Sequence, residues 1–237
     1  MRVLVTGAGG GLGGATVKAF RDAGWHVIPS DIKSGAWSEN ESNPLLGHIG
    51  SDEWIHDLQI LASGGLDAVV AAHGIEGTGG MHELQEPRIS QVMTVNFASV
   101  QSLYKETAEL LEAKSGTFVG ISSQAGIQGE PAAAAYCASK FAVKAYIDRL
   151  HANSKGSIRY RTLCPGATET PLLKKAFEGI AAAEGLTYQD ILDRRSAAVP
   201  VGRLGRPSDI GAAALWLAEL QTHANVVALV SGGEVLR

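Results

Sequence analysis

The stretch RVLVTGAGGGLGGATVKAFRDAG, residues 2–24, decides the fold of this chain. It begins with an apolar, β-branched run that predicts a buried strand, and it ends with an amphipathic helical pattern that stops at Gly24. The turn between them satisfies two patterns, T-G-x-x-x-G-x-G from Thr6 and G-x-G-x-x-G from Gly9. A strand, a glycine-rich turn and a helix in this order predict a nucleotide site, in which backbone amides and the helix N-terminus face a pyrophosphate.

The same alternation of strands and helices continues along the chain. Further strands are predicted at HVIPS, which reaches Asp31, and at 66–72, 116–122, SIRYRTLC and NVVALVS. Helical patterns occupy about 87–114, 132–153 and 207–220. This order predicts an α/β fold with a doubly wound parallel sheet of the Rossmann type, covered by helices on both faces. We expect residues 1–237 to form a single domain.

Two segments depart from this rhythm. Residues 32–50 are polar and rich in turn residues, so we expect a connecting helix there to be short or absent, with LLGHI as a possible strand. Residues 167–200 are long and charged and follow a strand end, where open α/β sheets bind ligands. We expect this insertion to form a substrate-binding lid with an apolar face made of Leu172, Leu173, Phe177 and Ile180.

Composition narrows the class of partner. The 237 residues are 45% hydrophobic and carry a net charge of −4, which favours neither nucleic acid nor an anionic membrane. Two isolated cysteines, Cys137 and Cys164, fit a reducing compartment, so we expect a cytoplasmic protein. The histidines form no cluster at metal-ligand spacing, and we expect no metal site. A small-molecule partner remains.

Asp31 bears on the choice of cofactor. It falls at the end of the second predicted strand, where a carboxylate accepts hydrogen bonds from the adenosine ribose hydroxyls of NAD and repels the 2′-phosphate of NADP. Lys33 is a contrary signal, although the glycine turn contains neither arginine nor lysine. We therefore expect NAD, with NADP as the less favoured cofactor.

The segment ISSQAGIQGEPAAAAYCASK, residues 121–140, supplies a candidate catalytic group. In a helix, Tyr136 and Lys140 are four residues apart and share one face. At roughly 5 Å and an effective dielectric constant near 20, the ammonium would stabilise a phenolate by about 3 kcal/mol, lowering the phenol pKa by roughly two units. Such a tyrosine could exchange a proton with an alcohol or ketone, and Ser123 could hold the same oxygen.

TGAGGGLG, VNFAS, ISSQAG, AYCASK and CPGATETP occur in an order and spacing that resemble the classical short-chain dehydrogenase/reductase family over essentially the whole chain. The resemblance implies the catalytic set Asn96, Ser123, Tyr136 and Lys140. Ser123 would orient the substrate, Tyr136 would act as acid or base, Lys140 would also hold the nicotinamide ribose, and Asn96 would anchor a water. Cofactor contacts are expected at Thr6, Gly7, Gly11, Leu12, Gly13, Asp31, Ala72, Gly74, Tyr136, Lys140, Pro165, Gly166, Thr168 and Thr170.

The sequence also departs from the family pattern. Where the family usually has Asn-Asn-Ala-Gly after its fourth strand, this chain has Ala71, Ala72, His73 and Gly74, so we expect less polar support of the central sheet. His73 is then a structural or cofactor-adjacent residue. The aspartate that often contacts adenine has no clear counterpart, because Asp52 falls late.

These observations predict an NAD(H)-dependent enzyme that interconverts a secondary alcohol and a ketone through a Tyr/Lys/Ser proton relay. One alternative is an NADPH-dependent carbonyl or 3-oxoacyl reductase. An alternative of another class is a regulatory module that binds NAD without chemistry, although such modules often lack the tyrosine or lysine. The family resemblance implies a homo-oligomer, a tetramer or dimer.

Overall fold

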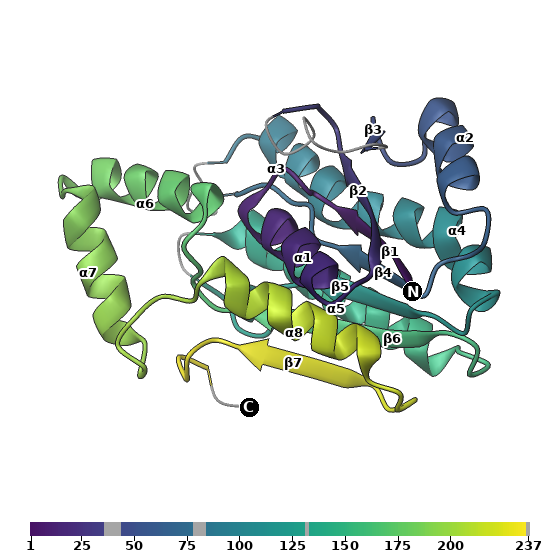
Figure 1. Ribbon diagram of the computed structural model, residues 1–237. Coiled ribbons are helices and arrows are strands. Elements are labelled where there is room, and N and C mark those ends of the chain that lie inside the picture. The colour runs from purple at the N-terminus through teal and green to yellow at the C-terminus, as the bar shows by residue number, and fades with distance from the viewer. Residues whose placement is uncertain (36–43, 78–83, 131–132, 236–237) are drawn as a thin grey trace.

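The computed structural model describes residues 1–35, 44–77, 84–130 and 133–235 (Figure 1). Within them, seven strands form one sheet in the order β3-β2-β1-β4-β5-β6-β7, and every neighbouring pair is parallel. The strands are β1 (Arg2–Thr6), β2 (His26–Asp31), β3 (Leu45–Leu46), β4 (Ala68–Ala71), β5 (Thr117–Ile121), β6 (Arg159–Pro165) and β7 (Val226–Val230). The predicted doubly wound α/β fold is confirmed.

Helices cover both faces of the sheet, which explains why the central strands are apolar throughout (Figure 1). On one face, α1 (Gly11–Asp22) and α8 (Pro207–Glu219) pack against the sheet through Val17, Phe20 and Leu217. On the other face lie α2 (Asp52–Leu61), α4 (Ser99–Glu112) and α5 (Ala134–Ala152), with Trp54 and Ile147 in the core. None of the described helices is long and apolar enough to cross a bilayer.

The strand order changes direction at β1, which pairs with β2 on one side and with β4 on the other. The connections that leave the carboxyl ends of β1 and β4 therefore run to opposite sides of the sheet and open a crevice between them. The glycine turn follows β1, and residues 72–77 follow β4. This edge of the sheet is where a ligand is expected.

The helix expected at about 87–114 is interrupted. It consists of α3 (Glu86–Met93), a π-helical turn at Thr94–Ala98 and α4. Between β2 and α2 the described residues form only the two-residue strand β3, as the turn-rich sequence predicts, and residues 36–43 of that segment lie outside the description. The helix predicted from 132 begins at Ala134, and residues 131–132 are likewise not described.

The segment after β6 forms α6 (Pro171–Glu184) and α7 (Tyr188–Ala198), which lie at one side of the sheet in Figure 1. Gly185, at a φ of 68°, ends α6, and a capping box of Thr187 with Asp190 starts α7. The two helices share a small apolar cluster, separate from the main core, made of Phe177, Ala181, Ile191, Val199 and Leu204.

Candidate active site

The glycine turn is shaped by close backbone contacts. Gly7 has a φ of 69°, and a Cβ there would lie 2.7 Å from the Cα of His73. A Cβ on Gly13 would lie 1.9 Å from the carbonyl oxygen of Gly7, so the first turn of α1 can pack on β1 only without a side chain. At Gly10, the residue that precedes α1, no side chain caps the helix. The first amides of α1 are therefore open to an anion, which fits a dinucleotide pyrophosphate.

Thr170 closes this turn from the other side. A Cβ on Gly11 would lie 2.8 Å from the Cγ2 of Thr170, so the start of α6 lies against the start of α1. The Thr170 hydroxyl accepts a hydrogen bond from the N–H of Leu173 (3.2 Å) and keeps its own hydrogen for another acceptor. Thr168 donates to the carbonyl of Gly166 (2.9 Å), which fixes the path of the chain after Pro165.

Asp31 ends β2 beside the glycine turn. Its Oδ2 accepts a hydrogen bond from the N–H of Gly9 (2.9 Å), and its Oδ1 accepts one from the N–H of Ile32 (2.7 Å). The carboxylate thus lies at the outer end of the turn, where the sequence predicts the adenosine ribose.

His73, in the position where polar support of the sheet was expected to be reduced, makes two side-chain hydrogen bonds. Ser99 donates its hydroxyl hydrogen to the carbonyl of Val95 (2.6 Å), so it accepts a hydrogen bond from Nε2–H of His73 (2.7 Å). Nδ1 of His73 is then the acceptor, and Thr6 donates to it (2.6 Å). Burial, followed by the charge of Lys140, lowers the pKa of His73 to about 3. A neutral imidazole therefore links β1 to α4, confirming a structural role.

Asn96 lies in the π-helical turn and is fully buried. Its amide accepts from the N–H of Ile75 (2.8 Å) and donates to the carbonyl of Ile75 (3.0 Å) and the hydroxyl of Ser139 (3.0 Å). Ser139 in turn donates to the carbonyl of Tyr136 (2.7 Å). The extra residue of a π turn changes the direction of its side chains, and here it directs Asn96 toward α5.

Ser123 and Tyr136 both line the cavity described below, whereas Lys140 lies behind them and is only 5% exposed. The Ser123 oxygen accepts from the N–H of Ala125 (3.1 Å), so its hydrogen is available to a second oxygen. The Lys140 ammonium donates to the carbonyl of Ile121 (3.0 Å) and lies 5.7 Å from the centre of the Tyr136 ring. Gly74 lies beside both Asn96 and Lys140.

The expected fall in the phenol pKa is not found in the protein alone. Burial raises the pKa of Tyr136 to about 12, the Ser123 hydroxyl opposes this rise, and the charges of Glu130 and Cys137 add to it. Burial also lowers the pKa of Lys140 to about 8. The expectation from the helical spacing counted the attraction between ammonium and phenolate but left out the cost of burying both charges, and that cost is larger here.

A cavity of about 500 Å³ brings together seven of the sixteen predicted catalytic and cofactor-contact residues. Its inner wall contains Leu12, Ser123, Tyr136, Pro165, Gly166, Thr168 and Thr170. Its outer wall includes Leu172, Leu173, Phe177 and Ile180 of α6, which confirms the apolar face predicted for this segment. Thr6 is buried outside the cavity and bonds to His73, Asp31 lies at the far end of the glycine turn, and Ala72 lies just beyond β4.

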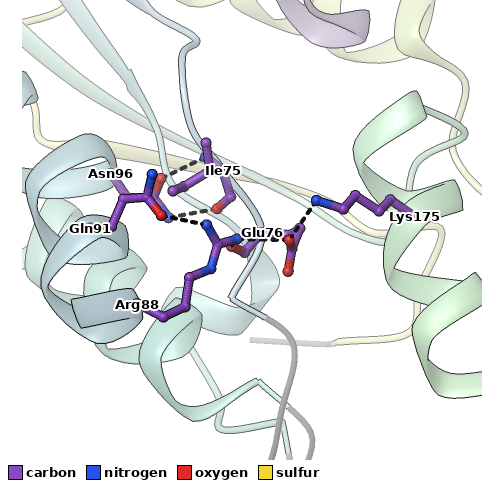
Figure 2. A network of polar contacts seen from close by, with 6 residues as sticks. All are labelled: Ile75, Glu76, Arg88, Gln91, Asn96 and Lys175. Atoms are coloured by element: carbon purple, nitrogen blue, oxygen red, sulfur yellow. Dashed lines mark hydrogen bonds and ion pairs between the residues drawn. The ribbon is translucent and has the colours of Figure 1, made fainter. Parts of the chain in front are cut away.

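Glu76 connects the two sides of this cavity. Figure 2 shows its carboxylate between Arg88 of α3 and Lys175 of α6, with N–O distances of 2.7 Å and 3.2 Å. Arg88 also donates to Gln91 (2.7 Å), and the neighbouring Ile75 is held by Asn96. The ion pair with Lys175 therefore ties α6 to the loop that carries the backbone partners of Asn96.

Sequence reasoning missed several residues of the site. Glu76 lies in no quoted pattern, Ser139 stands in AYCASK but was given no role, and nothing in VNFAS indicates a π turn. Gln124 and Glu130, which also line the cavity, could have been suspected because both lie in the segment between Ser123 and Tyr136. No group of three or more histidine, cysteine, aspartate or glutamate side chains suited to a metal occurs in the described part of the chain.

Known proteins share this architecture. The model of a family described as short chain dehydrogenase matches residues 55–181. L-Fucose dehydrogenase of Mus musculus is 32% identical over 245 residues, covering 99% of this chain and 88% of that protein. The 2-keto-3-deoxy-L-fuconate dehydrogenase of Xanthomonas campestris is 28% identical over 232 residues, covering 92% of this chain and 73% of that protein. The solved structure of ligand-free aldohexose dehydrogenase from Thermoplasma acidophilum has a TM-score of 0.87 at 24% identity. The match covers 98% of this chain and 93% of that structure.

The family match covers more than half of the chain, and the mouse relative aligns with nearly all of it. The glycine turn, the buried asparagine and the Ser123/Tyr136/Lys140 group occupy one edge of the sheet, as the sequence patterns require. The chain therefore belongs to the short-chain dehydrogenase family of oxidoreductases.

Proposed function

We propose that this protein oxidises a secondary alcohol to a ketone with NAD, or catalyses the reverse reaction. The observation that carries the proposal is the pair of hydroxyls of Ser123 and Tyr136 in one cavity, with Lys140 and Asn96 buried directly behind them. Two hydroxyls at one point can hold a single substrate oxygen and exchange its proton.

Each residue of this group has a distinct task in the proposed reaction. Ser123 accepts from the N–H of Ala125 and, with substrate bound, donates its hydroxyl hydrogen to the substrate oxygen and orients it. Tyr136 gives a proton to that oxygen in reduction and takes one from it in oxidation, and its raised pKa keeps the phenol protonated for the reductive direction. When bound, the oxidised nicotinamide would accept hydride from the carbinol carbon, and its positive charge would lower the pKa of the phenol.

The residues behind the cavity hold this geometry. Asn96 fixes α5 through Ser139 and fixes the loop after β4 through Ile75. Lys140 places a positive charge beside the phenol ring, and we propose that it also binds the nicotinamide ribose. The glycine turn and Thr170 would hold the pyrophosphate.

NAD is proposed over NADP because Asp31 places a carboxylate at the outer end of the glycine turn, 2.9 Å from the amide of Gly9. There it can accept hydrogen bonds from ribose hydroxyls, and it would repel a 2′-phosphate. The names of the relatives, which include an L-fucose dehydrogenase and an aldohexose dehydrogenase, support a hydroxylated substrate.

A panel of secondary alcohols and ketones, assayed with both cofactors by the absorbance of the reduced nicotinamide, tests the activity. For cofactor choice, Asp31→Ala should weaken the binding of NAD. It should also lower kcat/KM with NAD relative to kcat/KM with NADP. The control is Asp22→Ala, which removes the same charge at the exposed end of α1, where Asp22 pairs with Lys18. An unchanged ratio in the Asp31 variant would reject NAD specificity through this residue. Cofactor binding without turnover across the panel would favour a regulatory module.

A further inference from the structure

A polar corner of the cavity is built around Gln124, the residue after Ser123. Its side chain is 2% exposed, and its amide nitrogen donates to Glu130 (3.0 Å) and Glu234 (3.0 Å). These two bonds use both amide hydrogens and fix which way the amide faces. The carbonyl oxygen, Oε1, is then a buried acceptor with no hydrogen-bond partner among the described residues.

Gln124 lines the cavity together with Gly166. A Cβ on Gly166 would come within 2.9 Å of the orphaned oxygen, so this oxygen packs against the backbone of Gly166. A buried acceptor without a donor is unfavourable, so it is expected where a ligand or water supplies the missing hydrogen. The orphaned oxygen thus indicates a hydroxyl donor in this corner.

Glu130 extends the corner toward the reacting groups. It lines the same cavity, and Gln124 uses only one of its two carboxylate oxygens. Tyr136 lines this cavity too, and the charge of Glu130 contributes to the raised pKa of its phenol. A substrate held by Tyr136 would therefore share the cavity with a strong acceptor.

The charges of the cavity disfavour an anionic substrate. Arg194 is bound by Glu184 at 2.7 Å and 3.1 Å, and Arg195 is bound by Glu234 at 2.9 Å. In the described lining, both arginines are thus matched by carboxylates, and Glu130 adds a further negative charge. A carboxylate, sulfonate or phosphate on the substrate would meet no uncompensated cation there.

We propose that Glu130 and Gln124 form a specificity subsite for a second, uncharged hydroxyl of the substrate, next to the carbon that is oxidised. The proposal rests on the proposed function and narrows its substrate class to neutral vicinal diols and sugars. Glu130 accepts a charge-assisted hydrogen bond from that hydroxyl, and Gln124 supplies the orphaned oxygen as a second acceptor. Sites that bond a substrate hydroxyl reject the analogue that lacks it, because their buried acceptor is left unpaired.

Three probes of similar size test the subsite: 1,2-cyclohexanediol, cyclohexanol and 2-hydroxycyclohexane-1-carboxylate. With the intact protein, kcat/KM for the diol should exceed that for cyclohexanol by about ten-fold or more. The hydroxy acid should be the poorest of the three because its carboxylate faces Glu130. A hydroxy acid that is preferred over the diol overturns the proposal.

Two variants separate the subsite from general damage. Glu130→Leu removes the acceptor and should bring the ratio of diol to cyclohexanol close to one, whereas Glu130→Gln keeps a neutral acceptor and should give an intermediate ratio. Glu178→Gln changes an exposed carboxylate of α6 that pairs with Lys174 outside the described cavity lining, and it should keep the ratio of the intact protein. An unchanged ratio in Glu130→Leu overturns the proposal, and thermal unfolding checks that each variant is folded.

A binding measurement keeps this test independent of turnover. Calorimetric titration in the presence of NADH, with which an alcohol does not react, should show tighter binding of the diol than of cyclohexanol, and Glu130→Leu should remove the difference. If none of the probes or panel substrates is oxidised or reduced but this difference is present, the subsite stands and the proposed function fails. Equal behaviour of diol and cyclohexanol in both turnover and binding overturns the subsite.

Discussion

Helices α5 and α6 face the same cavity, but the protein holds them in different ways. The side chains of Val143 and Ile147 anchor α5 in the main core, and two hydrogen bonds fix it from neighbouring elements, Ser122 to the Lys140 carbonyl (2.8 Å) and Asn96 to Ser139 (3.0 Å). In contrast, α6 packs with α7 on a small separate cluster. Ion pairs tie this unit to the rest of the chain, Lys175 with Glu76 and Arg195 with Glu234.

This difference matches the two tasks of the cavity walls. Proton exchange needs groups held within a fraction of an ångström, and buried contacts with complete hydrogen bonds provide that precision. Substrate entry needs a wall that can move, and helices with few core contacts open at low free-energy cost. We therefore expect variants of α5 to change the chemical step and variants of α6 to change binding.

The largest effect is expected from Tyr136→Phe, which removes the proton carrier and leaves the ring in place. kcat should fall by about 10²–10⁴-fold, while NAD affinity stays within a few-fold. Leu172→Ala, on the opposite wall, should instead raise KM more than it lowers kcat. Steady-state kinetics and cofactor titration measure both. More than about a tenth of normal activity in the Phe variant would refute the acid–base role.

Hydrogen exchange compares the two walls directly. In the free protein, amides of α6 and α7 should exchange about 100-fold or more faster than those of the middle of α5, because opening them disrupts only the small cluster around Phe177. Adding NADH and 1,2-cyclohexanediol should slow exchange in α6 and α7 and leave α5 unchanged. Equal, strong protection of both walls in both states would show that the 167–200 segment is no lid.

The stability of the folded protein should also depend on pH through His73, which lies on the buried side of the site. Its pKa is about 3 in the folded protein and 6.5 in its ordinary state, so below pH 6.5 the unfolded chain binds a proton that the folded protein does not. Acidification from pH 7 to pH 5 should therefore cost up to about 2 kcal/mol of the free energy of unfolding. Urea unfolding at both pH values measures this loss.

Between pH 7 and pH 5, His73→Asn should reduce the loss in the free energy of unfolding by up to about 2 kcal/mol, because asparagine does not titrate. His56→Asn, on the exposed face of α2, is the matched control and should leave the loss as it is. If the two variants behave alike, His73 does not remain neutral in the folded protein.

The smallest effect is expected from Lys175→Met, which removes the ion pair between α6 and Glu76. The lysine is 73% exposed, so the pair contributes less than about 1 kcal/mol, and KM should rise only a few-fold with kcat unchanged. Lys174→Met is the control, because Lys174 pairs with Glu178 within α6 itself. An equal rise of KM in both variants would show that the loss of one positive charge on α6, and not the loss of the ion pair with Glu76, causes the effect.

Much of the site could be predicted because its parts are local in sequence. A glycine that avoids a clash, as at Gly13, and a pair on one helix face, as Tyr136 and Lys140, follow from short-range geometry. The apolar face of α6 was predictable for the same reason, since its residues recur at helical spacing.

Other parts depend on contacts between distant segments. Asn96 lies in a π turn and bonds to Ile75 and Ser139, which belong to other parts of the chain. The pKa of Tyr136 is raised, opposite to the expectation, because burial by surrounding elements is the largest influence on it. His73 gained its role from partners 67 and 26 residues away.

The sequence by itself determined the order of strands and helices, the glycine turn and the spacing of the proton-exchanging groups, because each is set by periodicity and backbone conformation within a few residues. Only the tertiary structure decided which polar groups share an environment. Gln124, Glu130 and Glu234 come together across 110 residues, and their arrangement leaves Oε1 of Gln124 without a hydrogen-bond partner among the described residues. Burial and hydrogen-bond completion are properties of the assembled fold, and the polar corner depends on them.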